Sequence, residues 1–207
     1  MTQTPQSPVL MATDASIDGR TMRRTRNRTA VITALLDMIR EGDLHPGAAE
    51  IAERAGVSHR SIFRYFDDLD DLARTTIHQA FRDAAPLSTI PDPGVGSLAD
   101  RVSRLVDSRL ALLAYVDGPM QLARIRSYSI PSIDEEIAVI AEQFRVQISE
   151  HFAAELAEQS LPEREFIVDA VLVLTSYDAY TIHTRLLASS TERIRAAWVT
   201  ALTALLS

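Results

Sequence analysis

The chain has 207 residues, of which 46% are hydrophobic and 24% are charged, and it contains no cysteine. The length allows one or two domains with a sizeable core, and the lack of cysteine excludes disulfides and thiolate metal sites. No apolar run approaches the roughly 18 residues that a membrane-spanning helix needs, and residues 1–18 lack the apolar segment of a signal peptide. We therefore expect a cytoplasmic protein that does not contact a membrane.

The net charge of −7 argues at first against binding to nucleic acid, but the charge is unevenly distributed. Residues 1–66 contain 9 Arg and 7 acidic residues, whereas residues 67–207 contain 12 Arg and 21 acidic residues. Such asymmetry is more informative than the total charge. It indicates a basic N-terminal segment followed by an acidic body.

The N-terminal segment begins with residues 1–19, which have no periodic apolar face and are expected to be a disordered tail. An arginine cluster follows, comprising Arg20, Arg23, Arg24, Arg26 and Arg28. It is either a solvated charge run or, as we favour, an arm that reaches DNA phosphates or the minor groove. A first helix is predicted from about 26 to 40, where Val31, Ala34, Leu35 and Met38 form one apolar stripe.

Residues 48–66 have the pattern of two short helices joined by a tight turn. Ile51, Ala52 and Ala55 give the first helix an apolar face, and Gly56 can end it in a left-handed conformation. Ser58 can cap the second helix, which buries Ile62 and Phe66. This is the pattern of a helix-turn-helix, whose second helix lies in the DNA major groove.

The rest of the chain is predicted to be helical. The expected helices cover about 69–84, 97–115, 119–128, 132–158, 162–187 and 189–206, with a Pro- and Gly-rich linker at 85–97 and a break at 117–119. Ser97 with Asp100, Ser132 with Glu135, and Ser160 with Glu163 have capping-box spacing. No strand pattern is present, so we predict an all-α fold in which residues 20–67 form a DNA-binding domain and residues 68–207 form a larger helical domain.

An all-α enzyme is the main alternative from another class of function. The five histidines have no zinc-protease spacing, and the chain has neither a Gly-x-Ser-x-Gly elbow nor a phosphate-binding loop. We therefore expect no enzymatic activity, no cofactor and no bound metal.

The string Ile-Ala-Glu-Arg-Ala-Gly-Val-Ser at 51–58, followed by Ser-Ile-Phe at 61–63, Tyr-Phe at 65–66 and Leu72, resembles the tetracycline-repressor (TetR) family of bacterial transcription regulators. The resemblance covers about residues 26–72. It implies an all-α homodimer that binds double-stranded operator DNA and holds a small-molecule effector in its C-terminal body. The most specific expectation is a repressor that the effector releases from a palindromic operator.

The arginine cluster, the resemblance and the outward positions of the second helix together give the expected DNA-binding residues: Arg20, Arg23, Arg24, Arg26, Gly47, Ser58, His59, Arg60, Ser61, Arg64 and Tyr65. Arg60 either reads a guanine or contacts a phosphate, and Arg64 is expected to contact a phosphate. Besides Arg60, where the family often has a small residue, three positions depart from the family pattern: Phe63 lacks the usual tyrosine hydroxyl, Leu69 replaces a lysine and Gly47 replaces a capping Ser or Thr. Because four aspartates also lie at 67–71, we expect the arginine arm to supply more of the affinity than usual, so that deleting residues 1–24 flattens the salt dependence.

The C-terminal body is expected to contain an effector pocket and a dimer interface. The candidate pocket residues are His78, Phe81, Arg109, Tyr115, Met120, Arg124, Tyr128, Phe144, Tyr177 and Tyr180, although for each of them alone ordinary core packing is the favoured interpretation. If Arg109 and Arg124 are buried they need anions, either an acidic side chain or an anionic ligand. The last two helices are expected to form a four-helix bundle between subunits through Phe166, Val171, Leu174, Leu186, Trp198, Leu202 and Leu205.

A third interpretation is a protein of this fold that has lost DNA binding and acts as a partner module. The aspartates at 67–71 and Leu69 are the features that favour it.

Overall fold

The computed structural model describes residues 14–128 and 130–207, and every regular element in these ranges is a helix. The predicted all-α fold is therefore confirmed. The chain divides into two compact units, Met1–Leu72 and Ala73–Ser207, with the division inside a single helix. No helix within the described ranges has the length and apolar character required to cross a membrane.

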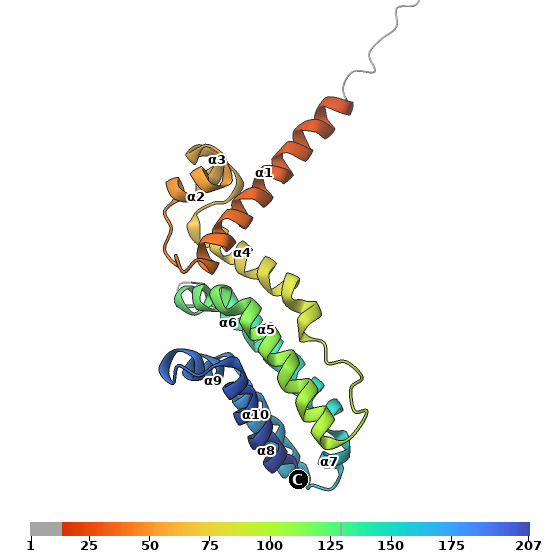
Figure 1. The fold of residues 1–207 in the computed structure, drawn as a ribbon. Helices are drawn as coiled ribbons and strands as arrows, with labels where there is room; N and C mark the ends of the chain where they lie inside the picture. The colour runs from red at the N-terminus through yellow and green to blue at the C-terminus, as the bar shows by residue number, and fades with distance from the viewer. Residues whose placement is uncertain (1–13, 129) are drawn as a thin grey trace, which may run out of the picture. The chain divides into compact units, whose positions relative to one another are not determined.

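The N-terminal unit contains α1 (Asp14–Arg40), α2 (Ala48–Ala55), α3 (His59–Tyr65) and the start of α4 (Leu69–Ala84) (Figure 1). Both α1 and α3 pack against α2. The buried side chains of this unit are mainly branched aliphatics with one aromatic ring: Val31, Leu35, Ile39, Ile51, Ile62, Phe66 and Leu72. They fall on the predicted apolar stripes, because a short amphipathic helix is stable only when that face is covered.

Helix α1 begins earlier than the sequence pattern indicates. Residues 14–19 were expected to belong to a disordered tail, but they form the first turns of α1. Residues 1–13 of the expected tail lie outside the described part of the chain. The expectation of an arm starting at Arg20 is thus corrected: the arginines lie on a continuous 27-residue helix, which fixes their spacing.

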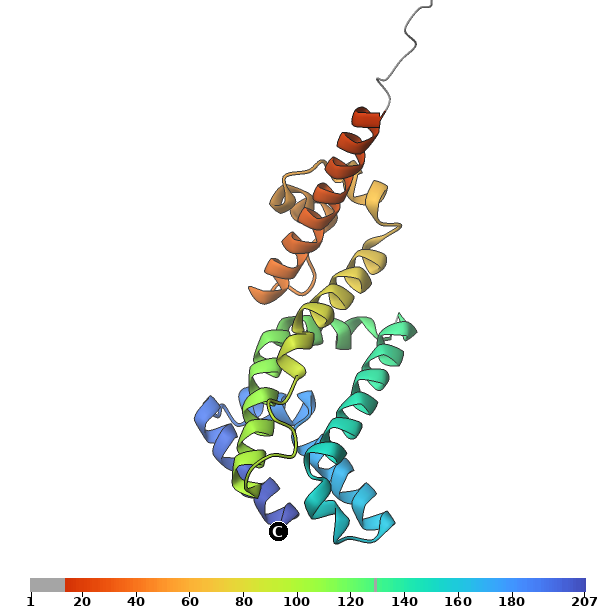
Figure 2. The same ribbon diagram turned by 90° about the vertical axis from the view of Figure 1, so that its right-hand side faces the viewer.

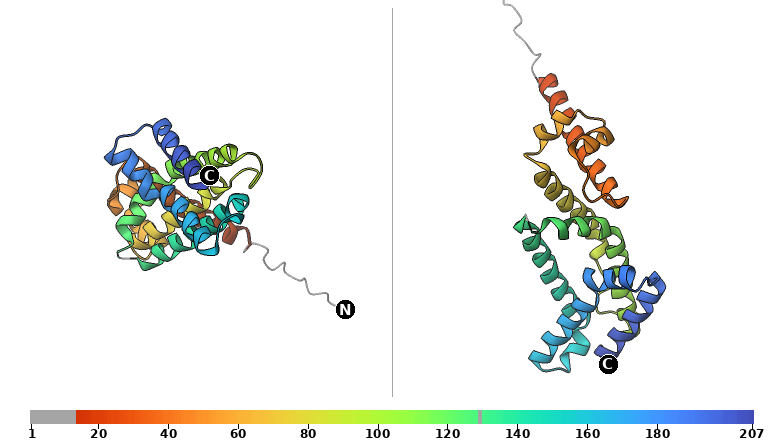
Figure 3. Two further views of the ribbon diagram at one scale, coloured as in Figure 1. Left: turned by 90° about the horizontal axis from the view of Figure 1, so that it is seen from below. Right: turned by 90° about the vertical axis from the view of Figure 1, so that its left-hand side faces the viewer.

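The C-terminal unit contains the rest of α4, η1 (Ala85–Ser88), α5 (Leu98–Arg126), α6 (Pro131–His151), α7 (Ala153–Ala157), α8 (Leu161–Leu174), α9 (Tyr177–Thr181), η2 (Ile182–Leu186, a π-helical turn) and α10 (Thr191–Leu206). Helices α5 and α6 run in opposite directions (Figures 2 and 3). Helix α10 packs along α5 and also contacts α8, while α6 packs against α8.

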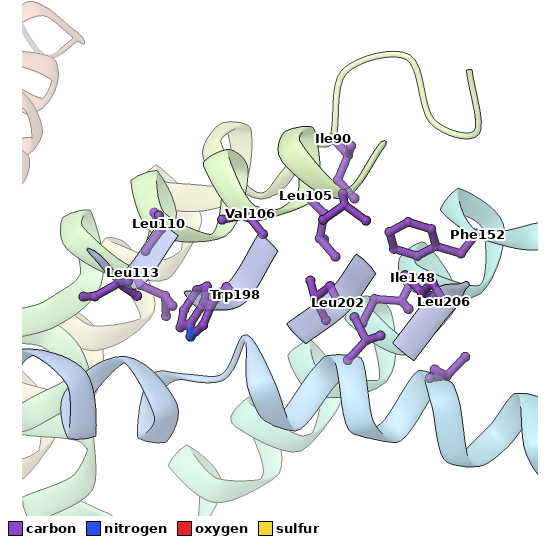
Figure 4. Packing of buried hydrophobic residues seen from close by; sticks show 14 of the residues in the cluster. Ile90, Leu105, Val106, Leu110, Leu113, Ile148, Phe152, Trp198, Leu202 and Leu206 are labelled. Carbon is purple, nitrogen blue, oxygen red and sulfur yellow. The ribbon is translucent and has the colours of Figure 1, made fainter. Parts of the chain in front are cut away.

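The main core of this unit lies between α5, α6, α8 and α10. Trp198 and Leu202 of α10 lie among Leu105, Val106 and Leu110 of α5 (Figure 4). A smaller cluster joins α4, α5 and α6 through Ala84, Leu112 and Val116, with Phe81, Tyr115, Met120 and Phe144 packed around it. The unit therefore has one core near the C-terminal helices and another beside α4.

Several predicted helix boundaries are wrong. The break expected at 117–119 is absent, because α5 continues through Pro119. Its C-terminal part bends, as expected when a proline removes a backbone hydrogen bond inside a helix (Figure 2). The helix expected at 162–187 instead ends at Leu174 and resumes at Tyr177.

The predicted caps are partly confirmed. Ser97 accepts the Asp100 N–H at 3.2 Å, and the Glu163 carboxylate accepts the Ser160 N–H at 3.0 Å. The pair predicted at Ser132 and Glu135 is not a cap, because α6 begins at Pro131.

Candidate functional site

The turn between α2 and α3 has the geometry that the sequence predicts. Gly56 adopts φ = 66° and its N–H donates to the Glu53 carbonyl at 3.1 Å, while the Val57 N–H donates to the Ala52 carbonyl at 3.0 Å. These bonds close the end of α2 in a left-handed cap, which costs glycine little because it has no Cβ. The turn therefore sets the direction in which α3 leaves α2.

Helix α3 separates a buried side from an exposed side. Ile62 is fully buried, whereas His59, Arg60, Phe63 and Arg64 are exposed. The His59 and Phe63 rings make an edge contact, with 5.2 Å between centroids. The exposed face thus presents two guanidinium groups, an imidazole and an apolar ring, and each of these can contact a base edge or a phosphate.

The serines at the start of α3 do not make the predicted cap. Ser58 precedes the helix in an extended conformation, but its hydroxyl makes no side-chain cap bond. Its Oγ lies 2.8 Å from Ser61 Oγ, and the Ser61 N–H donates to the Ser58 carbonyl at 2.8 Å. The neighbouring hydroxyl replaces the backbone N–H as the partner, so the two serines form one polar pair at the N-terminus of α3.

A hollow of about 400 Å³ lies between α1 and the C-terminal end of α3. Its lining is polar and strongly basic: Thr21, Arg23, Arg24, Asn27, Arg64 and Tyr65. Thr21 and Asn27 were not predicted from the sequence, although Asn27 follows Arg23 by four residues and so shares its helix face. Three guanidinium groups around one hollow make a surface suited to a phosphate.

The Tyr65 hydroxyl is held inside this group of side chains. Arg64 Nη2 donates to it at 2.6 Å and Asn27 Nδ2 at 3.4 Å. Burial alone raises the pKa of Tyr65, but the hydrogen bonds from Arg64 and Asn27 and the charges of Arg64 and Arg24 outweigh burial and lower the pKa. The hydroxyl therefore sits in a positive environment and is oriented before any ligand arrives.

The other expected DNA-binding residues of the N-terminal unit are more scattered. Arg26 is exposed on α1 but does not line the hollow, and Arg20 lies in α1. Arg28 stacks over the Phe66 ring at 5.0 Å and so contributes to packing. The Gly47 N–H donates to Glu50 Oε2 at 2.7 Å, which means that a phosphate would have to compete with this carboxylate.

The aspartates between α3 and α4 have a structural role. Asp68 Oδ1 accepts the Asp71 N–H at 2.7 Å, and Asp71 Oδ2 accepts the Asp67 N–H at 3.2 Å. Carboxylates at a helix N-terminus satisfy free backbone amides and interact favourably with the helix dipole. The formation of α4 thus accounts for these residues without any reference to DNA.

In the C-terminal unit, the structure brings five of the ten candidate pocket residues together. Phe81, Tyr115, Met120 and Phe144 pack around the small apolar cluster of α4, α5 and α6. The Arg109 guanidinium lies over the Phe144 ring at 3.6 Å from its centroid. His78 pairs with Glu136 at 2.5 Å, which links α4 to α6.

Three other candidates form a separate polar group that joins α5 to α9. The Tyr177 hydroxyl donates to Asp117 Oδ1 at 2.9 Å, and Arg124 pairs with Asp178 at 2.5 Å. Burial, followed by the hydrogen bond to Asp117 and its negative charge, raises the pKa of Tyr177; burial also raises the pKa of Tyr180. Tyr128 joins neither group, because it is 95% exposed.

Residues 31–76 match the family model described as bacterial regulatory proteins, tetR family. This segment is therefore similar to the DNA-binding region of the TetR family. This match spans the helix-turn-helix and the core around it, in agreement with the resemblance stated from the sequence.

Two solved structures share the fold over most of the chain. A transcriptional regulator from Rhodococcus sp. Rha1 has a TM-score of 0.66 at 20% identity, covering 86% of this chain and 95% of its own. The multidrug binding protein EbrR, complexed with imidazole, has a TM-score of 0.59 at 20% identity, covering 90% of each chain. No curated protein matches the sequence.

The residues expected at the dimer interface divide into three groups by their exposure. Phe166 and Leu186 are 70% and 78% exposed, and Leu174 and Leu205 are half-buried. Val171, Trp198 and Leu202 are at most 2% exposed and belong to the core of one protomer. This corrects the prediction for those three, because α10 turns its aromatic and leucine stripe toward α5.

Other exposed apolar side chains on α8, on η2 and directly after η2 were not predicted from the sequence. Val173 follows Phe166 by two helical turns, and Ile182 and Leu187 flank Leu186; each is at least 50% exposed. Large exposed apolar side chains mark an interaction site where they form a contiguous patch, so α8 and η2 are candidate interaction elements.

Proposed function

We propose that the protein is a homodimeric transcription regulator that binds a palindromic operator through α3 and is released from it by a small-molecule effector. The observation that carries the proposal is the exposed face of α3 beside the arginine-lined hollow. Helix α3, including Arg64 and Tyr65 of the hollow, lies within residues 31–76, which match the TetR-family model, and the α1 side of the hollow directly precedes this region.

DNA binding on this proposal uses two kinds of contact. Arg23, Arg24, Arg64 and Tyr65 surround a phosphate, while Arg60 reads a base edge in the major groove. Arginine binds guanine O6 and N7 together, which makes it the commonest side chain in specific contacts. Phosphate contacts supply affinity and register, and base contacts supply specificity.

Effector control on this proposal works through α4. This helix starts directly after the helix-turn-helix and carries Phe81 and Ala84 into the cluster with α5 and α6. A ligand that repacks this cluster acts on the same helix that leads to the DNA-binding unit. Such a ligand shifts the population of DNA-binding conformations only by its difference in affinity between them.

The experiment is a fluorescence-anisotropy titration of duplex DNA from the region upstream of the protein's own gene. We expect saturable binding that Arg60→Ala and Arg64→Ala each weaken, with Glu158→Ala on the C-terminal unit as the control. A protein that dimerises but binds none of the palindromic duplexes contradicts the proposal and favours the partner-module interpretation.

A further inference from the structure

A buried cation that has no counter-anion among the described residues lies on α5, against Phe144 of the small cluster of α4, α5 and α6. Arg109 is 1% exposed, and its Nη2 donates a hydrogen bond to Gln147 Oε1 at 3.0 Å. Its Nε and Nη1 are buried and have no hydrogen-bond partner in the part of the chain that the structure describes. A buried guanidinium is normally paired with an acid, because removal of its charge from water is costly.

A second arginine on the same helix provides an internal comparison. Arg101 lies eight residues before Arg109 and is also buried, at 6% exposure. It pairs with Glu155 and donates from Nη1 to the Gly96 carbonyl at 2.5 Å. The fold therefore supplies an anion for one buried arginine of α5 but only a neutral amide for the other.

The surroundings of Arg109 hold its guanidinium in place. Gln147 Nε2 donates to the Ser88 carbonyl at 2.8 Å, so the amide oxygen is the atom directed at Arg109. The Phe144 ring covers one face of the guanidinium at 3.6 Å. Because Phe144 covers one face of the guanidinium and Nη2 is bonded to Gln147, a ligand would meet the remaining N–H groups at the edge of the guanidinium.

The charge and polarity of the site around Arg109 indicate which class of ligand it would bind. Burial lowers the pKa of Arg109 to about 10, so that the group stays positive at neutral pH. The Phe144 ring that covers it belongs to an apolar and aromatic cluster with Phe81, Tyr115 and Met120. A single buried positive charge is neutralised by a monoanion, whereas a dianion would leave a net charge in apolar surroundings.

We infer that Arg109 is the anchor for an organic carboxylate effector whose apolar or aromatic body packs against Phe81, Tyr115, Met120 and Phe144. The inference deepens the proposed function, on which its regulatory meaning rests. Ligand entry requires these half-buried side chains to move, and an unbranched methionine adapts readily to such a change.

The test is isothermal titration calorimetry on the full-length protein without DNA. The probes are benzoate, phenylacetate and octanoate, each paired with its neutral amide, together with inorganic phosphate. We expect at least one carboxylate to bind at least tenfold more tightly than its amide and than phosphate. Arg109→Met should weaken that binding at least tenfold, while Arg82→Met, which removes an exposed arginine from α4, should leave it unchanged.

Stability provides an independent measurement. Arg109→Met removes an unpaired buried charge, so its melting temperature without ligand should equal or exceed that of the wild type. If Arg109→Met does not fold, Arg109→Lys keeps the charge and should keep the preference for the carboxylate over the amide.

Three results would overturn the inference: no carboxylate binds better than its amide, Arg109→Met binds the carboxylate as the wild type does, or phosphate is the preferred anion. Loss of DNA binding would contradict the proposed function but not the anion site. Because the two assays share no component except the protein, the two failures are distinguishable.

Discussion

His151 is buried at 1% exposure between two backbone partners. Its Nδ1 accepts the Gly94 N–H at 3.2 Å, so Nε2 carries the proton that is donated to the Arg101 carbonyl at 2.9 Å. Burial is the main cause that lowers the pKa of His151, and the positive charges of Arg104 and Arg101 lower it further. The hydrogen bond to the Arg101 carbonyl and the negative charge of Glu155 raise the pKa and so oppose this shift. The imidazole thus links the loop before α5 to the end of α6 in its neutral form.

This pKa predicts how stability depends on pH. The unfolded chain protonates His151 near the ordinary value of about 6.5, whereas the folded chain does so only at lower pH. Between these values the unfolded state binds more protons, so the free energy of unfolding decreases as pH falls below about 6.5. Urea midpoints at pH 7.5 and 5.5 should differ less for His151→Gln than for the wild type. Exposed His45→Gln should behave like the wild type, and equal differences in all three proteins would contradict the prediction.

Arg60 and Arg64 lie on the same exposed face of α3, but we expect their substitutions to affect DNA binding differently. Arg60→Ala should cost about 1–3 kcal/mol of discrimination at one G·C pair of each half-site. Arg64→Ala should weaken all sequences alike and reduce the salt slope by roughly 0.9 for each lost phosphate contact. Anisotropy titrations on the operator and on single-pair variants at two salt concentrations separate these effects. A uniform loss in Arg60→Ala would assign that residue to a phosphate.

Helix α1 changes the interpretation of the arginine cluster at the scale of an element. An extended arm would place its arginines independently, whereas α1 fixes Arg23 and Arg24 beside Arg64 and Tyr65. Arg23→Ala with Arg24→Ala should therefore reduce the magnitude of the salt slope by up to about 0.9 for each arginine that contacts a phosphate. Arg40→Ala removes one positive charge at the other end of α1 and serves as the control. It should leave the salt slope of DNA binding unchanged. An unaltered slope in the double variant would exclude the hollow as a phosphate site.

The helix boundaries show what periodicity predicts and what it misses. Apolar spacing correctly predicted the buried side of α2 and α3, because a short amphipathic helix has only one face to cover. The break between α8 and α9 contains neither Gly nor Pro. Thr175 Oγ1 instead bonds back to the Val171 carbonyl at 2.8 Å, and Ser176 Oγ accepts the Ala179 N–H at 3.2 Å. Such local side-chain bonds compete with the helix and give only a weak signal in a sequence.

The candidate sites were harder to predict than the helices, because an apolar stripe in the sequence identifies the buried face of a helix but not the element that packs against that face. Trp198 and Leu202 have the same spacing whether they meet α5 or a second protomer. Arg109 and Arg124 had the same expectation from the sequence, yet only Arg124 forms an ion pair within the described ranges. Contacts distant in the sequence decide between these cases, and a single sequence does not encode them in any local pattern.

At the scale of the whole molecule, the exposed apolar side chains of α8 and η2 give the sharpest prediction. Burying such groups contributes roughly 25 cal/mol per Å² of apolar surface, whereas a carboxylate in an apolar interface opposes association. Phe166→Glu and Leu186→Glu should therefore each convert a dimer into a monomer, as measured by light scattering on a sizing column. Val139→Glu on α6, which is also exposed at 58%, is the matched control and should leave the dimer intact.

Loss of the dimer should in turn weaken binding to the operator. Two linked α3 helices read half-sites about 34–36 Å apart, whereas one helix reads a single half-site. The monomeric variants should consequently bind the full palindrome no better than an isolated half-site, while the wild type distinguishes the two strongly. Dimers that persist in both variants would place the interface elsewhere, and monomers that bind the palindrome like the wild type would mean that two half-sites are not read together.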